Sequence, residues 1–313
     1  MGRLFDFMLP EAKSQAAHNT DSVFLFINDV SFLILLGITI ALIYFAIKYR
    51  RKSDDDITPV IKHNTKLEIT WSVIPLFLVM IVFGWGYSGW LNLKAVPDNA
   101  YEIHVTASKW NWLFKYQNGV ASPGEVHVPA GRPVKLVMQS TDVIHSFYVP
   151  EYRIKQDVLP NRYTYVWFEA DEPGESQVFC AEYCGTLHSG MLAKVIVHEQ
   201  DEFDEWLASQ NVAGEGQSPV EYGKSLFSIQ GCNACHTVDG SKLIGPSLQG
   251  AWNKEETLTD GSTITVDENY IRESILTPGE KIVTGFSNVM TPYEGIISDE
   301  EISALIEYIK TLK

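Results

Sequence analysis

Two long apolar runs near the start of the 313-residue sequence constrain its fold most. The first extends from Phe24 to Ile47 and the second from Ile69 to Leu93. Each is close to the ~20 residues that a helix needs to cross the hydrocarbon core of a membrane. A buried core helix is the competing interpretation, but two such runs so close together favour a membrane hairpin. The sequence therefore predicts two spans, over about residues 24–47 and 69–93.

The charges and aromatic residues around these runs predict their orientation. A basic cluster at residues 48–52 follows the first run, and Lys62 and Lys66 precede the second. Basic residues beside a span favour the cytoplasmic side of the membrane, and aromatic residues such as Trp85 and Trp90 gather at its interfaces. The loop is therefore predicted in the cytoplasm. Both the N-terminus and the C-terminal domains are predicted on the periplasmic side of the inner membrane.

The rest of the chain is predicted to form two domains joined by a linker. Segments rich in β-branched and aromatic residues recur between turn signals over residues 101–198, which predicts an all-β sandwich or barrel. A polar, glycine-containing stretch at residues 211–218 is typical of a linker. A mainly helical unit follows, and Ser298 and Glu301 form the capping-box pattern that begins its last helix. The predicted divisions are a membrane hairpin at 1–94, an all-β domain at 95–210, the linker at 211–218 and an all-α domain at 219–313.

The charge of the chain is concentrated in the predicted periplasmic part. The net charge is −15, and residues 95–313 carry 15 Lys and Arg against 31 Asp and Glu, a net of −16. This acidity argues against a nucleic-acid partner, because nucleic-acid binding requires basic surfaces. It is compatible with attraction of a cationic protein. An acidic surface that serves only solubility is the alternative.

A group of soft metal ligands lies at the end of the predicted β domain. Two Cys, one His and one Met fall within the stretch 180–191, and a further His lies upstream. Thiolate and thioether ligands favour copper, whereas imidazole also suits zinc and iron. Two Cys and two His can bind zinc, but the thioether favours a pair of copper ions bridged by the thiolates. The predicted ligands are His145, Cys180, the backbone carbonyl of Glu182, Cys184, His188 and Met191.

A second cofactor motif lies in the C-terminal unit. Cys232, Cys235 and His236 form a Cys-x-x-Cys-His run, which attaches haem c through two thioethers and supplies an iron ligand. Met290 precedes the last helix and is predicted as the sixth ligand, although core packing is the alternative for this side chain. Ligation by His and Met suits an electron carrier, because it raises the haem potential. A chance match or a zinc fragment is the alternative for the motif.

These motifs resemble those of a known family. The spacing from Cys180 to Met191, preceded by Asp142-x-x-His145, resembles the dinuclear CuA site of cytochrome c oxidase subunit II. That resemblance covers about residues 20–198 and implies a two-helix hairpin followed by a cupredoxin-like domain. Residues 219–313 resemble a class I cytochrome c, so the whole chain resembles a subunit II with a fused cytochrome c domain.

The resemblance implies an electron-entry role in a proton-pumping terminal oxidase. Electrons would pass from a cytochrome c or a quinol-oxidising complex through haem c and CuA to a separate haem-copper subunit I, which reduces O2 to water. Other oxidase subunits are further implied partners. The resemblance assigns electron entry to Trp110 and the mouth of a proton channel to Glu68. It also implies that Glu182 reaches a magnesium ion shared with subunit I.

Three other functions compete with this interpretation. A nitric oxide reductase could use a similar copper subunit, and the sequence of the large subunit would separate the two enzymes. A membrane-anchored copper-binding or copper-delivery protein would not need the haem motif at Cys232, Cys235 and His236. A quinol oxidase subunit would lack the copper ligands, which this sequence has.

Overall fold

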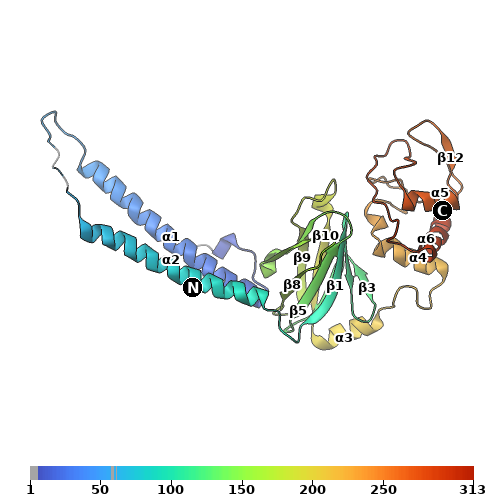
Figure 1. The fold of residues 1–313 in the computed structure, drawn as a ribbon, viewed down its shortest axis with the longest axis horizontal. Helices are drawn as coiled ribbons and strands as arrows, with labels where there is room; N and C mark the ends of the chain where they lie inside the picture. The colour runs from blue at the N-terminus through green and yellow to red at the C-terminus, as the bar shows by residue number, and fades with distance from the viewer. Residues whose placement is uncertain (1–5, 58–59, 61) are drawn as a thin grey trace. The chain divides into compact units, whose positions relative to one another are not determined.

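The computed structural model describes residues 6–57, 60 and 62–313, and its ribbon is drawn in Figure 1. The chain forms two compact units. One contains the residues up to Asp98 together with Glu151–Arg153, and the other contains Asn99–Pro150 and Ile154–Lys313. The first five residues of the predicted N-terminal segment lie outside the described residues.

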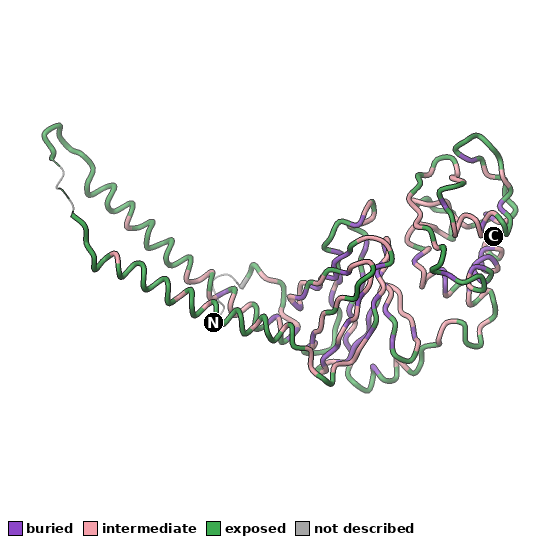
Figure 2. Tube along the Cα trace, viewed as in Figure 1, coloured by how far each residue is buried: buried purple, intermediate pink, exposed green. Residues whose placement is uncertain are grey.

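Two long helices, α1 (Gln15–Lys48) and α2 (Thr65–Lys94), dominate the first unit and follow a short 3-10 helix, η1 (Asp6–Met8). Their 34 and 30 residues correspond to lengths of about 50 and 45 Å at 1.5 Å per residue, more than the ~30 Å hydrocarbon core. Figure 2 shows both helices exposed along most of their lengths, and the only buried residues of the pair are Ala17 and Leu25. Apolar helices exposed all round require lipid or a partner as their surroundings. Both predicted spans are confirmed as helices, and each helix extends beyond its apolar run.

Polar contacts fix the start of α1. The Ser14 hydroxyl caps the helix by accepting a hydrogen bond from the Ala17 N–H at 3.1 Å. About two turns later, the Arg153 guanidinium holds both carboxylate oxygens of Asp21 at 2.8 Å. Because such a two-pronged pair fixes direction as well as distance, the loop that contains Arg153 is held against the first turns of α1.

The second unit begins with a sandwich of two five-stranded sheets. One sheet has the strand order β3-β2-β1-β5-β8 and the other β4-β10-β9-β6-β7, and each is mixed because β1 pairs parallel with β5 and β4 pairs parallel with β10. The predicted all-β domain is confirmed. The strands are β1 (Tyr101–Ser108), β2 (Asn111–Lys115), β3 (Ala121–Pro123), β4 (Glu125–Pro129), β5 (Val134–Ser140), β6 (His145–Val149), β7 (Ile154–Val158), β8 (Thr164–Phe168), β9 (Gly174–Cys180) and β10 (Leu192–His198).

Alternation along the strands builds the core of the sandwich. In β5, every second residue from Val134 to Ser140 is buried, because successive side chains point to opposite faces of a sheet. Trp112, Phe114 and Phe147 meet in this core with their rings edge-on, with centroids 5.5 Å apart for Trp112–Phe147 and 6.3 Å for Phe114–Phe147. This aromatic packing supports the end of the sandwich at which β6 begins and β9 ends.

Helix α3 (Gln200–Ser209) covers a pair of histidines, the buried His127 and the half-buried His198, on the β4–β10 edge of the sandwich. His127 Nδ1 lies 2.8 Å from His198 Nε2, and the Trp206 ring stacks on His127 at a centroid distance of 3.9 Å. Burial of His127, and then the neighbouring His198, together lower the pKa of His127 to about 4. The neutral imidazole is therefore the form that the fold accommodates.

The protein should lose stability as the pH falls from about 6.5 to about 4. The unfolded chain binds a proton at His127 near the ordinary pKa of 6.5, whereas the folded chain does so only near 4. The lowered pKa of His127 therefore contributes to the free energy of unfolding, and the contribution is complete above pH 6.5. It amounts to roughly 3 kcal/mol, at about 1.4 kcal/mol per pKa unit. Thermal unfolding followed by tryptophan fluorescence should show a smaller fall in Tm at low pH for His127→Gln than for wild type. The exposed His104→Gln provides the matched control, and equal pH dependence in all three proteins would contradict the prediction.

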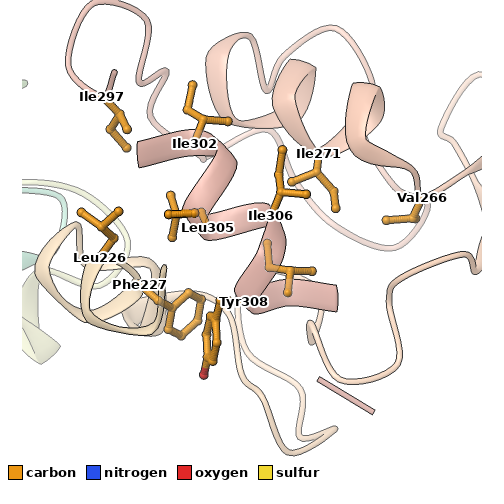
Figure 3. Close-up of a cluster of buried hydrophobic side chains, with 11 residues drawn as sticks. Leu226, Phe227, Val266, Ile271, Ile297, Ile302, Leu305, Ile306 and Tyr308 are labelled. Carbon is orange, nitrogen blue, oxygen red and sulfur yellow. The ribbon is translucent and has the colours of Figure 1, made fainter. Parts of the chain in front are cut away.

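The C-terminal part of the second unit is mainly helical. Helices α4 (Pro219–Ile229), α5 (Glu268–Leu276) and α6 (Asp299–Thr311) enclose a core of Leu, Ile, Phe and Tyr side chains from all three (Figure 3). The predicted capping box is confirmed: the Glu301 N–H donates to the Ser298 hydroxyl at 3.3 Å, and the Ser298 N–H donates to the Glu301 carboxylate at 2.7 Å. A small hairpin of β11 (Glu255–Thr257) and β12 (Thr263–Thr265) precedes α5, and the sequence pattern did not predict it.

Candidate metal centre and haem site

The soft ligands predicted from the sequence come together at one end of the sandwich. Candidate ligand atoms of His145, Cys180 and Cys184 all lie within 4.8 Å of one another. The two sulfurs are 3.8 Å apart, and Cys184 Sγ is also 3.5 Å from His188 Nδ1 and 3.8 Å from Met191 Sδ. Cys184 therefore contacts three of the other predicted ligand side chains.

Strand ends and one loop bring these residues together. His145 is the first residue of β6 and Cys180 is the last residue of β9, and these neighbouring strands pair antiparallel. The other three side chains come from the loop between β9 and β10, which contains the 3-10 helix η3 (His188–Gly190). The Glu182 carbonyl oxygen of this loop lies 3.2 Å from Cys180 Sγ. Sequence spacing alone identified the loop residues, and strand pairing supplies the distant His145.

The site is mostly buried, and the ionisation of its two thiols favours binding of cations. Burial opposes ionisation of Cys180, but the His145 imidazole and neighbouring backbone groups outweigh it and lower the pKa of this thiol to about 6. Burial, and then the charge of Cys180, raise the pKa of Cys184. Two thiolates this close repel each other, and bound metal cations relieve such repulsion.

The donor set fits two copper ions. The two sulfurs are close enough for both to contact the same ions, and each has an imidazole beside it. The Met191 thioether is fully buried and faces Cys184, which suits a weak copper ligand. Two thiolates, two imidazoles, one thioether and one carbonyl exceed the four ligands that a structural zinc ion takes.

The C-terminal unit provides a cavity for a haem. Cys232 and Cys235 flank the short helix η4 (Cys232–Ala234), directly before His236. Two adjoining hollows in this unit share six lining residues: His236, Pro246, Tyr270, Ser274, Val283 and Met290. The structure therefore places the predicted proximal His and the predicted sixth ligand on the walls of the same cavity.

The orientation of His236 suits an iron ligand. Its Nδ1 lies 2.8 Å from the Pro246 carbonyl oxygen, which fixes the ring and leaves Nε2 as the metal-binding atom. Burial lowers the pKa of His236, so the neutral, ligating form is favoured. Gly245 permits this packing, because a Cβ there would lie 2.6 Å from His236 Cε1. The mainly apolar cavity and its paired Cys residues fit a covalently attached haem.

Comparison with known proteins agrees with this organisation along the chain. Residues 3–85 match the transmembrane domain of cytochrome c oxidase subunit II, residues 119–199 match its periplasmic domain, and residues 220–313 match cytochrome c. The cytochrome c oxidase subunit 2 of Alkalihalophilus pseudofirmus is 35% identical over 302 residues, which cover 92% of this chain and 86% of that protein. The chain belongs to the cytochrome c oxidase subunit II family.

Other proteins are similar either to most of this subunit II chain or to its periplasmic domain. The subunit 2 of Bacillus subtilis is 28% identical over 294 residues, which cover 86% of this chain and 82% of that protein. A crystal structure of the periplasmic domain of a Bradyrhizobium japonicum subunit II is 28% identical; the match covers 37% of this chain and 96% of that domain, with a TM-score of 0.36. This subunit II is a membrane protein with two transmembrane helices, a periplasmic CuA-type domain and a fused cytochrome c domain.

The other predicted functional residues occupy different places in this subunit II. Trp110 is buried in the sandwich, and its ring approaches the loop that carries Cys184. Glu68 lies in the first turn of α2, where its carboxylate pairs with His63 Nδ1 at 2.7 Å. The Glu182 side chain is exposed, while the carbonyl oxygen of the same residue lies 3.2 Å from Cys180 Sγ.

Two residues beside the metal cluster were not assigned roles from the sequence. Asp142 Oδ1 accepts a hydrogen bond from His145 Nε2 at 2.9 Å, and the Trp112 ring packs edge-on against His145 at a centroid distance of 6.1 Å. The spacing Asp-x-x-His contained the signal for Asp142, because a carboxylate near a ligand His commonly orients it. No local pattern could have placed Trp112 against His145, since β2 and β6 belong to different sheets and the packing of the two sheets brings these residues together.

Proposed function

We propose that this chain accepts electrons from an external donor and delivers them to a haem-copper subunit I that reduces O2 to water and pumps protons. One observation supports this function above the others: a cluster of thiols, imidazoles and a thioether shares a chain with a Cys-x-x-Cys-His cytochrome domain. Copper sites with such ligands and haem c sites both carry out one-electron transfer. The described residues combine them with a membrane anchor, as an intrinsic oxidase subunit requires.

The chain's own residues hold and insulate the redox groups. When bound, copper and haem supply reversible one-electron chemistry. We propose that His145, Cys180, Glu182, Cys184, His188 and Met191 hold the copper ions, and that Cys232, Cys235, His236 and Met290 hold the haem. Burial of His145, Cys180, Cys184 and Met191 at the copper cluster excludes water and limits rearrangement when the charge changes.

Three further roles follow from the family and are proposals for this chain. Trp110 is proposed as the point of electron entry, because its buried ring approaches the copper-ligand loop. Glu68 is proposed to lie at the mouth of a proton channel in subunit I, and its position beside the titratable His63 supports a role in proton exchange. The exposed Glu182 carboxylate is proposed to share a magnesium ion with subunit I.

The fused cytochrome domain is proposed to act as a permanently tethered donor. The linker between α3 and α4 is nine residues long, from Gln210 to Ser218. A short flexible tether holds a partner at an effective concentration in the millimolar range. The external donor, a cytochrome c or a quinol-oxidising complex, would then need to reach only the haem domain.

A tagged chain purified from membranes tests this function. We expect it to bring down a large haem-copper subunit, and the complex to consume O2 when supplied with a reduced c-type cytochrome. A complex that reduces nitric oxide and not O2 would identify the alternative reductase. A chain that purifies alone with labile copper would contradict an oxidase role and indicate a copper-delivery protein.

A further inference from the structure

The Asp142 carboxylate connects two parts of the copper-binding domain. It lies in the turn between β5 and β6, and its side chain is only 7% exposed. One oxygen, Oδ1, accepts from His145 Nε2 at 2.9 Å and from the Val143 N–H at 2.6 Å. The other oxygen, Oδ2, accepts from the Lys109 N–H at 2.7 Å. Lys109 directly follows β1 in one sheet, whereas His145 begins β6 in the other.

The His145 side of this connection fixes a proposed copper ligand. The imidazole is fully buried, its Nδ1 lies 3.9 Å from Cys180 Sγ, and its Nε2 is occupied by Asp142. A ligand His that donates its second N–H to a carboxylate has a fixed tautomer and ring direction. The edge of Trp112 restricts the ring further.

The Lys109 side of the connection fixes the proposed entry residue. Trp110 follows Lys109 directly, so the hydrogen bond to the Lys109 N–H anchors the backbone immediately before the residue that carries the indole. The Trp110 ring lies against Gly185, where an added Cβ would be 3.1 Å from Trp110 Cζ2. Gly185 has φ +118°, a conformation that favours glycine, and it directly follows the ligand Cys184.

We propose that Asp142 is a positioning residue that holds the Trp110 segment and the copper ligand His145 in one fixed arrangement. The inference rests on the proposed function, because it takes the cluster as the copper centre and Trp110 as the entry point. The Ser140 hydroxyl also donates to Asp142 Oδ1, at 3.3 Å. Only a carboxylate satisfies all its neighbours, since both of its oxygens accept and all four partners donate. An asparagine of the same size would turn an N–H donor toward one of them.

The test compares Asp142→Asn with Asp157→Asn in the complete oxidase complex. Asp157 is a matched control, because it accepts a hydrogen bond from the hydroxyl of Ser146, the neighbour of His145, and contacts neither Lys109 nor His145. For Asp142→Asn we expect an altered or lost dinuclear copper signal in electron paramagnetic resonance. We also expect a fall of roughly 10–100-fold in kcat with a reduced cytochrome donor, the size typical of outer-shell changes at metal sites. Asp157→Asn should match wild type in both measurements.

Two further measurements distinguish positioning by Asp142 from a folding defect and from a docking charge. The haem c absorbance of the same chain reports whether each variant has folded and assembled. An unchanged copper signal in Asp142→Asn would overturn the inference. A rise in KM with unchanged kcat, with a difference from wild type that disappears at high salt, would also overturn it and indicate a docking charge only. A wild-type complex without a dinuclear copper signal would instead overturn the proposed function.

Discussion

Cys184→Ser should abolish the dinuclear copper centre and the oxygen uptake that depends on it. Cys184 lies within 3.8 Å of the sulfur of Cys180, Nδ1 of His188 and the sulfur of Met191, so its sulfur contacts three other ligand side chains of the cluster. A serine hydroxyl is a hard, weakly acidic ligand that copper does not favour. We expect cytochrome-driven oxygen uptake to fall by at least about 100-fold. Even substitutions of residues that only hydrogen-bond to a metal ligand commonly lower metal affinity or activity ~10–100-fold.

A neighbouring substitution provides the control for this experiment. Ser189 is exposed in the same loop and contributes none of the proposed ligands, so Ser189→Ala should retain copper and oxygen uptake. The haem domain of Cys184→Ser should keep its normal spectrum, since its ligands come from a separate part of the chain. Retention of both copper ions by Cys184→Ser would show that the Cys184 thiol is not a copper ligand.

Met290→Leu should remove the sixth haem ligand while leaving the haem attached. Met290 lines both hollows of the cavity that His236 also lines. Leucine has a similar volume but no sulfur, so the packing is nearly preserved. We expect complete loss of the methionine-to-iron charge-transfer band in the oxidised protein. We also expect a lower haem potential, because Met ligation raises it.

The matched substitution for this prediction is Met138→Leu. Met138 is fully buried in β5 of the sandwich, so it tests the effect of the same chemical change away from the haem. It should leave the charge-transfer band and the haem potential unchanged. A normal band in Met290→Leu would mean that another residue supplies the sixth ligand.

Features set by local sequence were predictable before the structure. The apolar runs gave the helices α1 and α2, and the pattern at Ser298 gave the start of α6, because each depends on residues that are neighbours in sequence. The copper loop was predictable for the same reason, since Cys180, Cys184, His188 and Met191 fall within one connection between strands.

Features that depend on pairing between distant segments were not predictable. The contact of Asp142 with Lys109 joins the ends of the paired strands β5 and β1, and the His127–His198 pair joins β4 to β10 under α3. Strand order and register fix such contacts, and neither can be inferred from alternation within single strands. The β11–β12 hairpin has only three residues in each strand, too few for an alternating pattern to be recognised.

The central claim is that the cluster around Cys180 and Cys184 holds a pair of copper ions that share one electron. Electron paramagnetic resonance of the oxidised full-length protein, combined with metal analysis, tests it most directly. The account predicts two copper ions and one haem per chain, with the hyperfine pattern of one unpaired electron shared by two copper nuclei. A single-copper pattern, or zinc in place of copper, would contradict it.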